Sequence, residues 1–142
     1  MLFSEILEFI VKHRDKGRSG AFAFPDEILV SYVVWAFQRD YITLTYDKTG
    51  ITSLIIVAPL NKDFNPEQDK LWSFDRFIPI NDEKDHPLAV LDFICIDKSC
   101  HKQIIEKLLV RFDNFLNQDK WAVRFNKPVR LPNKYFNHFY NL

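Results

Sequence analysis

Residues 88–125, LAVLDFICIDKSCHKQIIEKLLVRFDNFLNQDKWAVRF, decide the fold. The run 88–96 is apolar except for Asp92, which is typical of a central strand. Ser99 follows at a position that can cap a helix, and apolar residues recur through 104–116 at nearly helical spacing. Residues 121–125 then alternate as a strand does. A strand, a helix and a strand in this order predict a βαβ unit.

Upstream of this unit, residues 41–60 predict an antiparallel hairpin. The segments YITLTYD and ITSLIIVAPL are rich in β-branched and aromatic residues, and DKTG at 47–50 lies between them as the turn. Residues 61–85 are polar with interspersed aromatics and predict a long loop, a kind of segment that is often functional.

Two helices are expected before the hairpin. Apolar residues recur in pairs every four positions from Leu2 to Val11, and the helix should end near Arg14. Pro25-Asp26-Glu27 resembles a helix start, which favours a helix for 28–37, although this apolar run also fits a buried strand. After Pro128 the chain continues as a last strand or a short helix. We therefore expect one α/β (α+β) domain over 1–142, with a mixed sheet and flanking helices.

Composition narrows the class of protein. The chain has 142 residues, 47% of them hydrophobic and 27% charged, which is ordinary for one globular domain. A formal net charge of zero disfavours a dedicated nucleic-acid binder. The cysteines and histidines have no metal-binding spacing. There is no apolar run of the ~18 residues that span a membrane and no secretory signal, so we expect a cytoplasmic protein without a membrane span.

The order of hairpin, strand, loop, long helix and strand resembles the central part of the GCN5-related N-acetyltransferase (GNAT) fold. In that family the strand-to-helix junction binds the pyrophosphate of acetyl-CoA through amides at the helix N-terminus. Here the junction is 95–107, CIDKSCHKQIIEK, which contains no glycine, whereas the family's loop is usually rich in glycine. The resemblance implies that His101, Lys102 and Gln103 would contact the cofactor.

The layout is also similar to the toxin-activating lysine acyltransferases, a divergent branch of the same fold that takes its acyl group from acyl carrier protein. An N-terminal helix, the pair His13-Arg14, a second helix and the hairpin follow one another in the same order, and the likeness covers roughly residues 9–125. That family's catalytic pair is a His and an Asp. The resemblance implies His13 as the general base and Asp92 or Asp97 as its partner. No tightly bound cofactor is expected, and the donor would be an acyl-CoA or acyl carrier protein.

Each candidate also has a structural interpretation. His13 suits the negative end of a helix dipole, Asp92 can lie on a solvent face or in an ion pair, and Asp97 can cap a helix. Cys100, at a predicted helix N-terminus, would be an activated thiol or an inert buried one.

Two functions therefore stay open. One is acyl transfer from a thioester donor to an amine, and the other is a catalytically inactive GNAT-like module, such as a virus or a mobile element encodes, that binds a protein partner. Residues 120–142 are basic and aromatic, with Arg124, Arg130 and Lys134, and would dock an acidic carrier or target protein. Single-stranded nucleic acid is a third ligand for this segment, which the zero net charge disfavours.

Overall fold

The computed structural model describes residues 2–14, 25–67, 76–80, 85–112, 114–124 and 127–134. In chain order the elements are α1 (Leu2–His13), α2 (Asp26–Gln38), β1 (Ile42–Asp47), β2 (Gly50–Pro59), β3 (Leu88–Cys95), α3 (Ser99–Arg111), the 3-10 turn η5 (Phe115–Asn117), β4 (Lys120–Arg124) and β5 (Lys127–Arg130).

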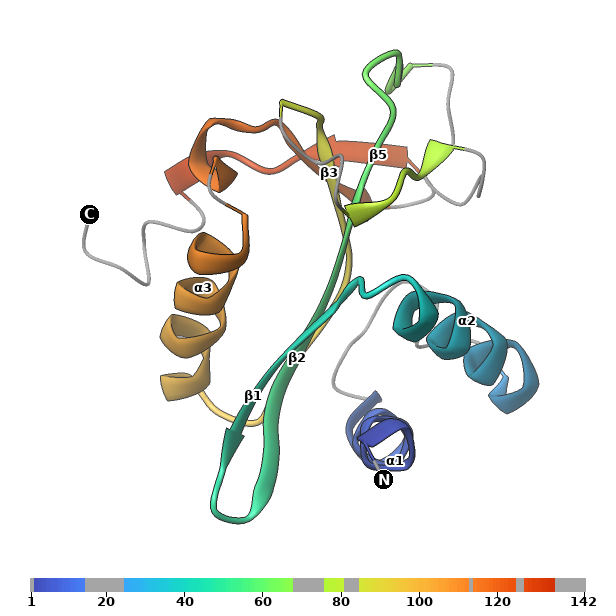
Figure 1. Cartoon of the computed structure of the whole chain (residues 1–142), viewed down its shortest axis with the longest axis vertical. Coiled ribbons are helices and arrows are strands. Elements are labelled where there is room, and N and C mark those ends of the chain that lie inside the picture. Colours follow the sequence, from blue (N-terminus) through green and yellow to red (C-terminus); the bar gives the residue numbers. More distant parts are fainter. Residues whose placement is uncertain are drawn as a thin grey trace.

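The strands form one mixed sheet in the order β1-β2-β3-β4-β5 (Figure 1). β1 and β2 are an antiparallel hairpin, β2 and β3 are antiparallel, and β3 and β4 are parallel across α3. The predicted α/β class, the hairpin and the βαβ unit are thus confirmed. The segment 28–37 lies in α2, and the strand alternative holds for 127–130, which pair with β4 as β5.

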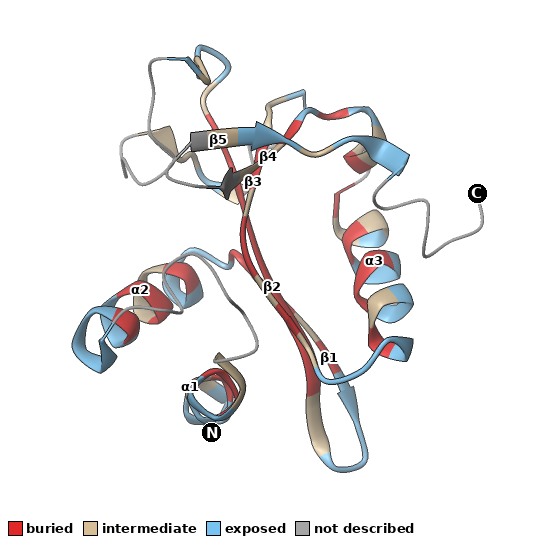
Figure 2. Cartoon of the chain, turned by 180° about the vertical axis from the view of Figure 1, so that it is seen from behind, coloured by how far each residue is buried: buried red, intermediate tan, exposed pale blue. Residues whose placement is uncertain are grey.

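Helices cover both faces of the sheet. α1 and α2 lie on one face and α3 on the other, and the buried sides of all three helices point toward the strands (Figure 2). Each face has its own apolar core. The first core includes Ile10, Leu29 and Ile56, and the second includes Val57 and Leu108. Burial of these side chains on both faces is the main stabilising term.

A β-bulge changes the direction of side chains in the middle of β3. Ile56 pairs with Asp92 while the next β2 residue, Val57, pairs with Val90, so Leu91 is an extra residue in the ladder. Leu91 packs in the first core and Asp92 bonds to α2, whereas Val90 packs against the second core. The bulge therefore places two successive side chains, one of them a carboxylate, on the α1/α2 face.

The parallel pairing of β3 and β4 is short. Leu88 pairs with Lys120 and Ala89 with Trp121, and the ladder ends there. Within the described residues, the rest of β3 from Val90 onward pairs only with β2. Among the described residues, the carboxyl half of β3 therefore has no paired strand on the side of β4, and this side is called the open edge of β3.

Candidate functional site

Asp92 and Tyr32 form a buried polar pair between β3 and α2. Each residue is 6% exposed, and the Tyr32 hydroxyl donates a hydrogen bond of 2.6 Å to Asp92 Oδ2. Burial, followed by the nearby Asp92 charge and this hydrogen bond, raises the pKa of Tyr32 well above its ordinary value. A buried carboxylate is costly unless hydrogen bonds satisfy it, and a protonated tyrosine is a suitable donor.

A series of aromatic contacts leads from Tyr32 through Trp35. Tyr32 stacks on Trp35 with ring centroids 5.9 Å apart, and Trp35 contacts Tyr41 and Phe77 edge-on, both at 5.2 Å. These contacts hold the Tyr32 ring in place, so its hydroxyl is directed at Asp92 by packing as well as by the hydrogen bond. Tyr32 is not marked out by the sequence, because it lies within the almost continuously apolar run 28–37.

His13 lies at the end of α1, half-buried, with its ring 4.8 Å from that of Phe9. The neighbouring Arg14 forms an ion pair of 2.9 Å with Asp26 at the start of α2. The described hydrogen bonds and ion pairs join His13 neither to Asp92 nor to Asp97. The predicted His-Asp pair therefore remains a prediction.

Asp97 lies at the start of α3 and is exposed. Its Oδ1 accepts a hydrogen bond of 2.9 Å from the Ser99 amide and another from the Ser99 hydroxyl, which together lower the pKa of Asp97. The next two amides, of Cys100 and His101, bond to backbone oxygens at 3.2 Å. The position where a helix N-terminus binds an anion is therefore occupied by a carboxylate of the chain itself.

The three predicted cofactor contacts follow on the first turns of α3. His101 is half-buried, with its ring edge-on to Phe93 at 5.2 Å, and burial lowers its pKa. Lys102 and Gln103 are exposed. His101 thus packs against Phe93 of the sheet, while Lys102 and Gln103 meet solvent.

The thiols next to this turn are sheltered. Cys100 is 4% exposed, and burial, with Cys100 beside it, raises the pKa of Cys95 to about 12. Such a pKa leaves Cys95 protonated and unreactive near neutral pH.

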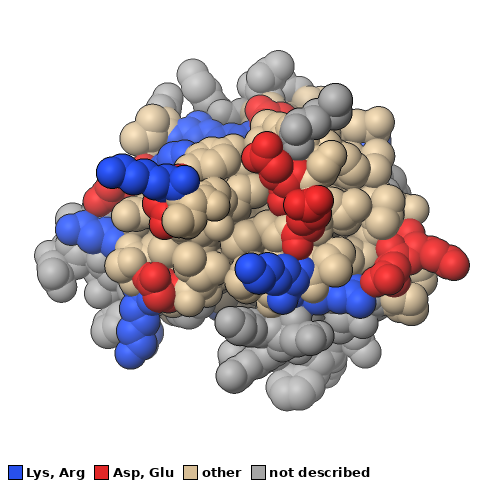
Figure 3. Space-filling view, turned by 90° about the horizontal axis from the view of Figure 1, so that it is seen from below, with Lys and Arg blue, Asp and Glu red and all other residues tan. Residues whose placement is uncertain are grey.

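The C-terminal basic segment is only partly a cationic surface. Arg130 forms an exposed ion pair of 2.8 Å with Asp119, and Lys134 is exposed. The side chain of Arg124 lies outside the described residues. Lys120 is 1% exposed and donates to the carbonyl oxygens of Phe115 at 2.5 Å and Gln118 at 2.7 Å. On the face in Figure 3, charges of both signs are interspersed.

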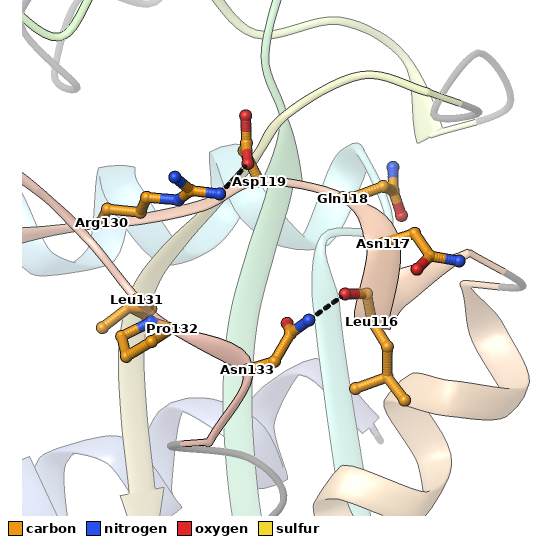
Figure 4. Close-up of a pocket in the computed structure, with 8 residues that line it drawn as sticks. All are labelled: Leu116, Asn117, Gln118, Asp119, Arg130, Leu131, Pro132 and Asn133. Carbon is orange, nitrogen blue, oxygen red and sulfur yellow. Dashed lines mark hydrogen bonds and ion pairs between the residues drawn. The ribbon is translucent and has the colours of Figure 1, made fainter.

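Two hollows flank the segment that leads into β4. The first has a volume of about 560 Å³, lies between η5 and β5 and is called the β5 hollow. In this hollow Arg130 forms its ion pair with Asp119, and Asn133 donates a hydrogen bond to the Leu116 carbonyl (Figure 4). The second, of about 550 Å³, lies where β2 ends and β3 and β4 begin and is called the strand-end hollow. Both are lined by Asn117, Gln118 and Asp119, which were not among the site residues predicted from the sequence.

Neither a metal centre nor a membrane helix is found within the described ranges. No three His, Cys, Asp or Glu side chains there are grouped to hold a metal ion. The described helices are all too short or too polar to cross a bilayer. Comparison with protein-family models, with curated proteins and with solved structures found no match.

Proposed function

We propose that the domain transfers an acyl group from a thioester donor to an amine. The observation that carries this proposal is the buried carboxylate of Asp92, which a bulge turns toward Tyr32 next to the open edge of β3. Strained or bulged strand positions with buried ionisable groups are frequent at reaction centres.

In the proposed reaction, the amine nitrogen attacks the thioester carbonyl, the new C–N bond forms and the C–S bond breaks. The proton lost by the amine passes to the Asp92 carboxylate and leaves with the thiolate as a thiol. Tyr32 keeps the carboxylate oriented through its 2.6 Å hydrogen bond. The family resemblance implies His13 as the general base with Asp92 or Asp97 as its partner, whereas this proposal makes the buried Asp92 the proton acceptor.

The open edge of β3 supports an extended donor. In open α/β sheets, ligands bind beyond the carboxyl ends of parallel strands. The backbone groups of β3 after Ala89 are placed to hydrogen-bond a linear, amide-containing arm such as pantetheine, as an edge strand binds a peptide.

The start of α3 favours acyl carrier protein over free CoA as the donor. The negative charge of Asp97, bonded to Ser99, would repel a pyrophosphate at that helix. An acidic carrier protein would meet exposed Arg130 and Lys134, together with Arg124, on the C-terminal segment. This donor also agrees with the expected cytoplasmic location.

The first test measures thermal unfolding with acetyl-CoA, a long-chain acyl-CoA and an acyl carrier protein. A donor that binds the folded state stabilises it by ~2.7 kcal/mol at a hundredfold excess over its dissociation constant. We expect the carrier protein to give the largest shift. A shift with none of the donors would contradict acyl transfer.

The second test follows acyl transfer to a lysine-containing peptide by mass spectrometry. Asp92→Asn should lower the rate by about 10² or more while the protein stays folded, because the amide cannot accept the proton. Asp47→Asn, at an exposed position of the hairpin turn, is the matched control and should keep the rate. Equal rates in the wild type and Asp92→Asn would remove Asp92 from the mechanism.

A non-catalytic interaction module is the second candidate function. The start of α3 favours this second function, because the Asp97 carboxylate fills the position where the GNAT family binds pyrophosphate. In that case, neutralising Arg124, Arg130 and Lys134 together should weaken partner binding and lower its salt dependence.

A further inference from the structure

The strand-end hollow lies where three connecting segments meet. β2 runs antiparallel to β3, and β3 runs parallel to β4, so the end of β2 and the starts of β3 and β4 share one edge region of the sheet. Its volume of about 550 Å³ is within the range of pockets that hold small ligands. The residues that carry the argument are Phe64, Asp85, Asn114, Asn117, Asp119 and Trp121.

Hydrogen bonds tie the walls of this hollow together. Gln118 Nε2 donates to the His86 carbonyl at 2.8 Å, and the Leu88 amide donates to the Asp119 carbonyl at 2.8 Å. Both bonds join the segment before β3 to the segment before β4. The site is therefore largely formed before any ligand arrives, which lowers the entropy cost of binding.

The charges around the strand-end hollow balance. Asp85, Asp119 and Lys62 line it, and Asp119 is paired at 2.8 Å with Arg130 next to it. Among the described residues, these two acidic and two basic groups balance, so together they select neither an anion nor a cation. This balance favours a neutral ligand.

The polar groups of the strand-end hollow are suited to a ligand with two adjacent hydroxyl groups. Asn117 Nδ2 donates to Asn114 Oδ1 at 2.9 Å, which places two amides side by side, with the Asp85 and Asp119 carboxylates on the same hollow. Asn114 Nδ2 also donates to Asp85 Oδ1 at 3.4 Å. An amide has two N–H donors and an oxygen with two lone pairs, so each amide keeps one N–H and at least one lone pair for a ligand. A vicinal diol, whose hydroxyls both donate and accept, matches this set.

Trp121 and Phe64 add an apolar wall. Their rings meet edge-on with centroids 5.9 Å apart, and both line the strand-end hollow. Aromatic rings pack against the C–H faces of sugars, while amides and carboxylates bond to the hydroxyls. We infer that the strand-end hollow is a binding site for a neutral saccharide, separate from the Asp92–Tyr32 pair.

The test titrates the full chain with neutral mono- and disaccharides, and with uncharged nucleosides as the competing class, by isothermal calorimetry and ligand-observed NMR. We expect saturable binding of at least one saccharide, with a dissociation constant of about a millimolar. Trp121→Ala and Asp85→Asn should each weaken it about tenfold or more. Asp85 has a φ of +62°, which asparagine also tolerates, so this variant should keep its fold.

Val110→Ala is the matched control, since Val110 is 81% exposed on α3 and outside the strand-end hollow. Binding should persist in this variant. The inference would be overturned if saccharide binding survived both pocket substitutions, or if only nucleosides bound. It would also be overturned if no saccharide bound saturably at concentrations up to roughly ten times the expected dissociation constant. Acyl transfer through Asp92 is measured separately, so either proposal can fail alone.

Discussion

Lys120 carries its ammonium group into the interior at the first position of β4. The Nζ atom donates to two carbonyl oxygens and lies 4.7 Å from the centre of the Phe115 ring. Burial still outweighs these contacts and lowers the pKa of Lys120 from 10.5 to about 8. A charged lysine here therefore opposes folding at neutral pH, and its loss of a proton favours the folded state.

Between about pH 8 and 10.5 the unfolded chain keeps the Lys120 proton and the folded protein has lost it. The free energy of unfolding should therefore rise with pH in this window, by up to ~1.4 kcal/mol per pH unit from this group. Urea denaturation of the wild type and Lys120→Met at pH 7, 8 and 9 isolates the effect, because Cys95 and Tyr32 titrate alike in both proteins. Parallel pH profiles would contradict the assignment.

At the scale of elements, α3 covers the outer edge of β1. Lys107 Nζ donates to the Leu44 carbonyl at 2.6 Å, and Arg111 donates to the Ile42 carbonyl at 2.9 Å. An uncovered edge strand presents such groups to other chains and promotes association. The two cations therefore protect the hairpin from edge-to-edge pairing as well as joining α3 to it.

Removing both cations, in Lys107→Ala/Arg111→Ala, should expose the β1 edge. We expect concentration-dependent self-association of the double variant, measured by analytical ultracentrifugation, whereas Lys102→Ala on the same helix should behave as the wild type. A double variant that sediments like the wild type at every concentration would show that the β1 edge is protected by other means.

At the scale of the whole molecule, two apolar cores share one sheet. Ile10 in the first core and Leu108 in the second are both 0% exposed. Because β2 and β3 contribute side chains to both cores, loss of either core should unfold the whole domain. Ile10→Ala and Leu108→Ala should each lower the free energy of unfolding by ~2–5 kcal/mol.

Circular dichroism and tryptophan fluorescence should report one shared transition in both core variants, since Trp35 and Trp121 pack against the first core. Val110→Ala, at an exposed position of α3, should change stability by less than ~0.5 kcal/mol. Two separate transitions would mean that the cores unfold independently.

Patterns within the sequence were sufficient to predict the elements and their order. The apolar period of α3, the β-branched segments of the hairpin and the strand-like run 88–96 depend on local backbone preferences and on which face is buried. These properties repeat along the chain, so a short window reveals them. Asp92 was noticed for the same reason, as the one charge in an apolar run.

Only the tertiary structure decided the surroundings of these residues. Tyr32 is 60 positions from Asp92 in the sequence. The hydrogen bond between them depends on a bulge at Leu91 that no sequence pattern predicts. The two hollows likewise depend on segments brought together by the directions of β2, β3 and β4. Burial and pairing of polar groups are set by contacts between distant segments, and these contacts exist only once the chain has packed.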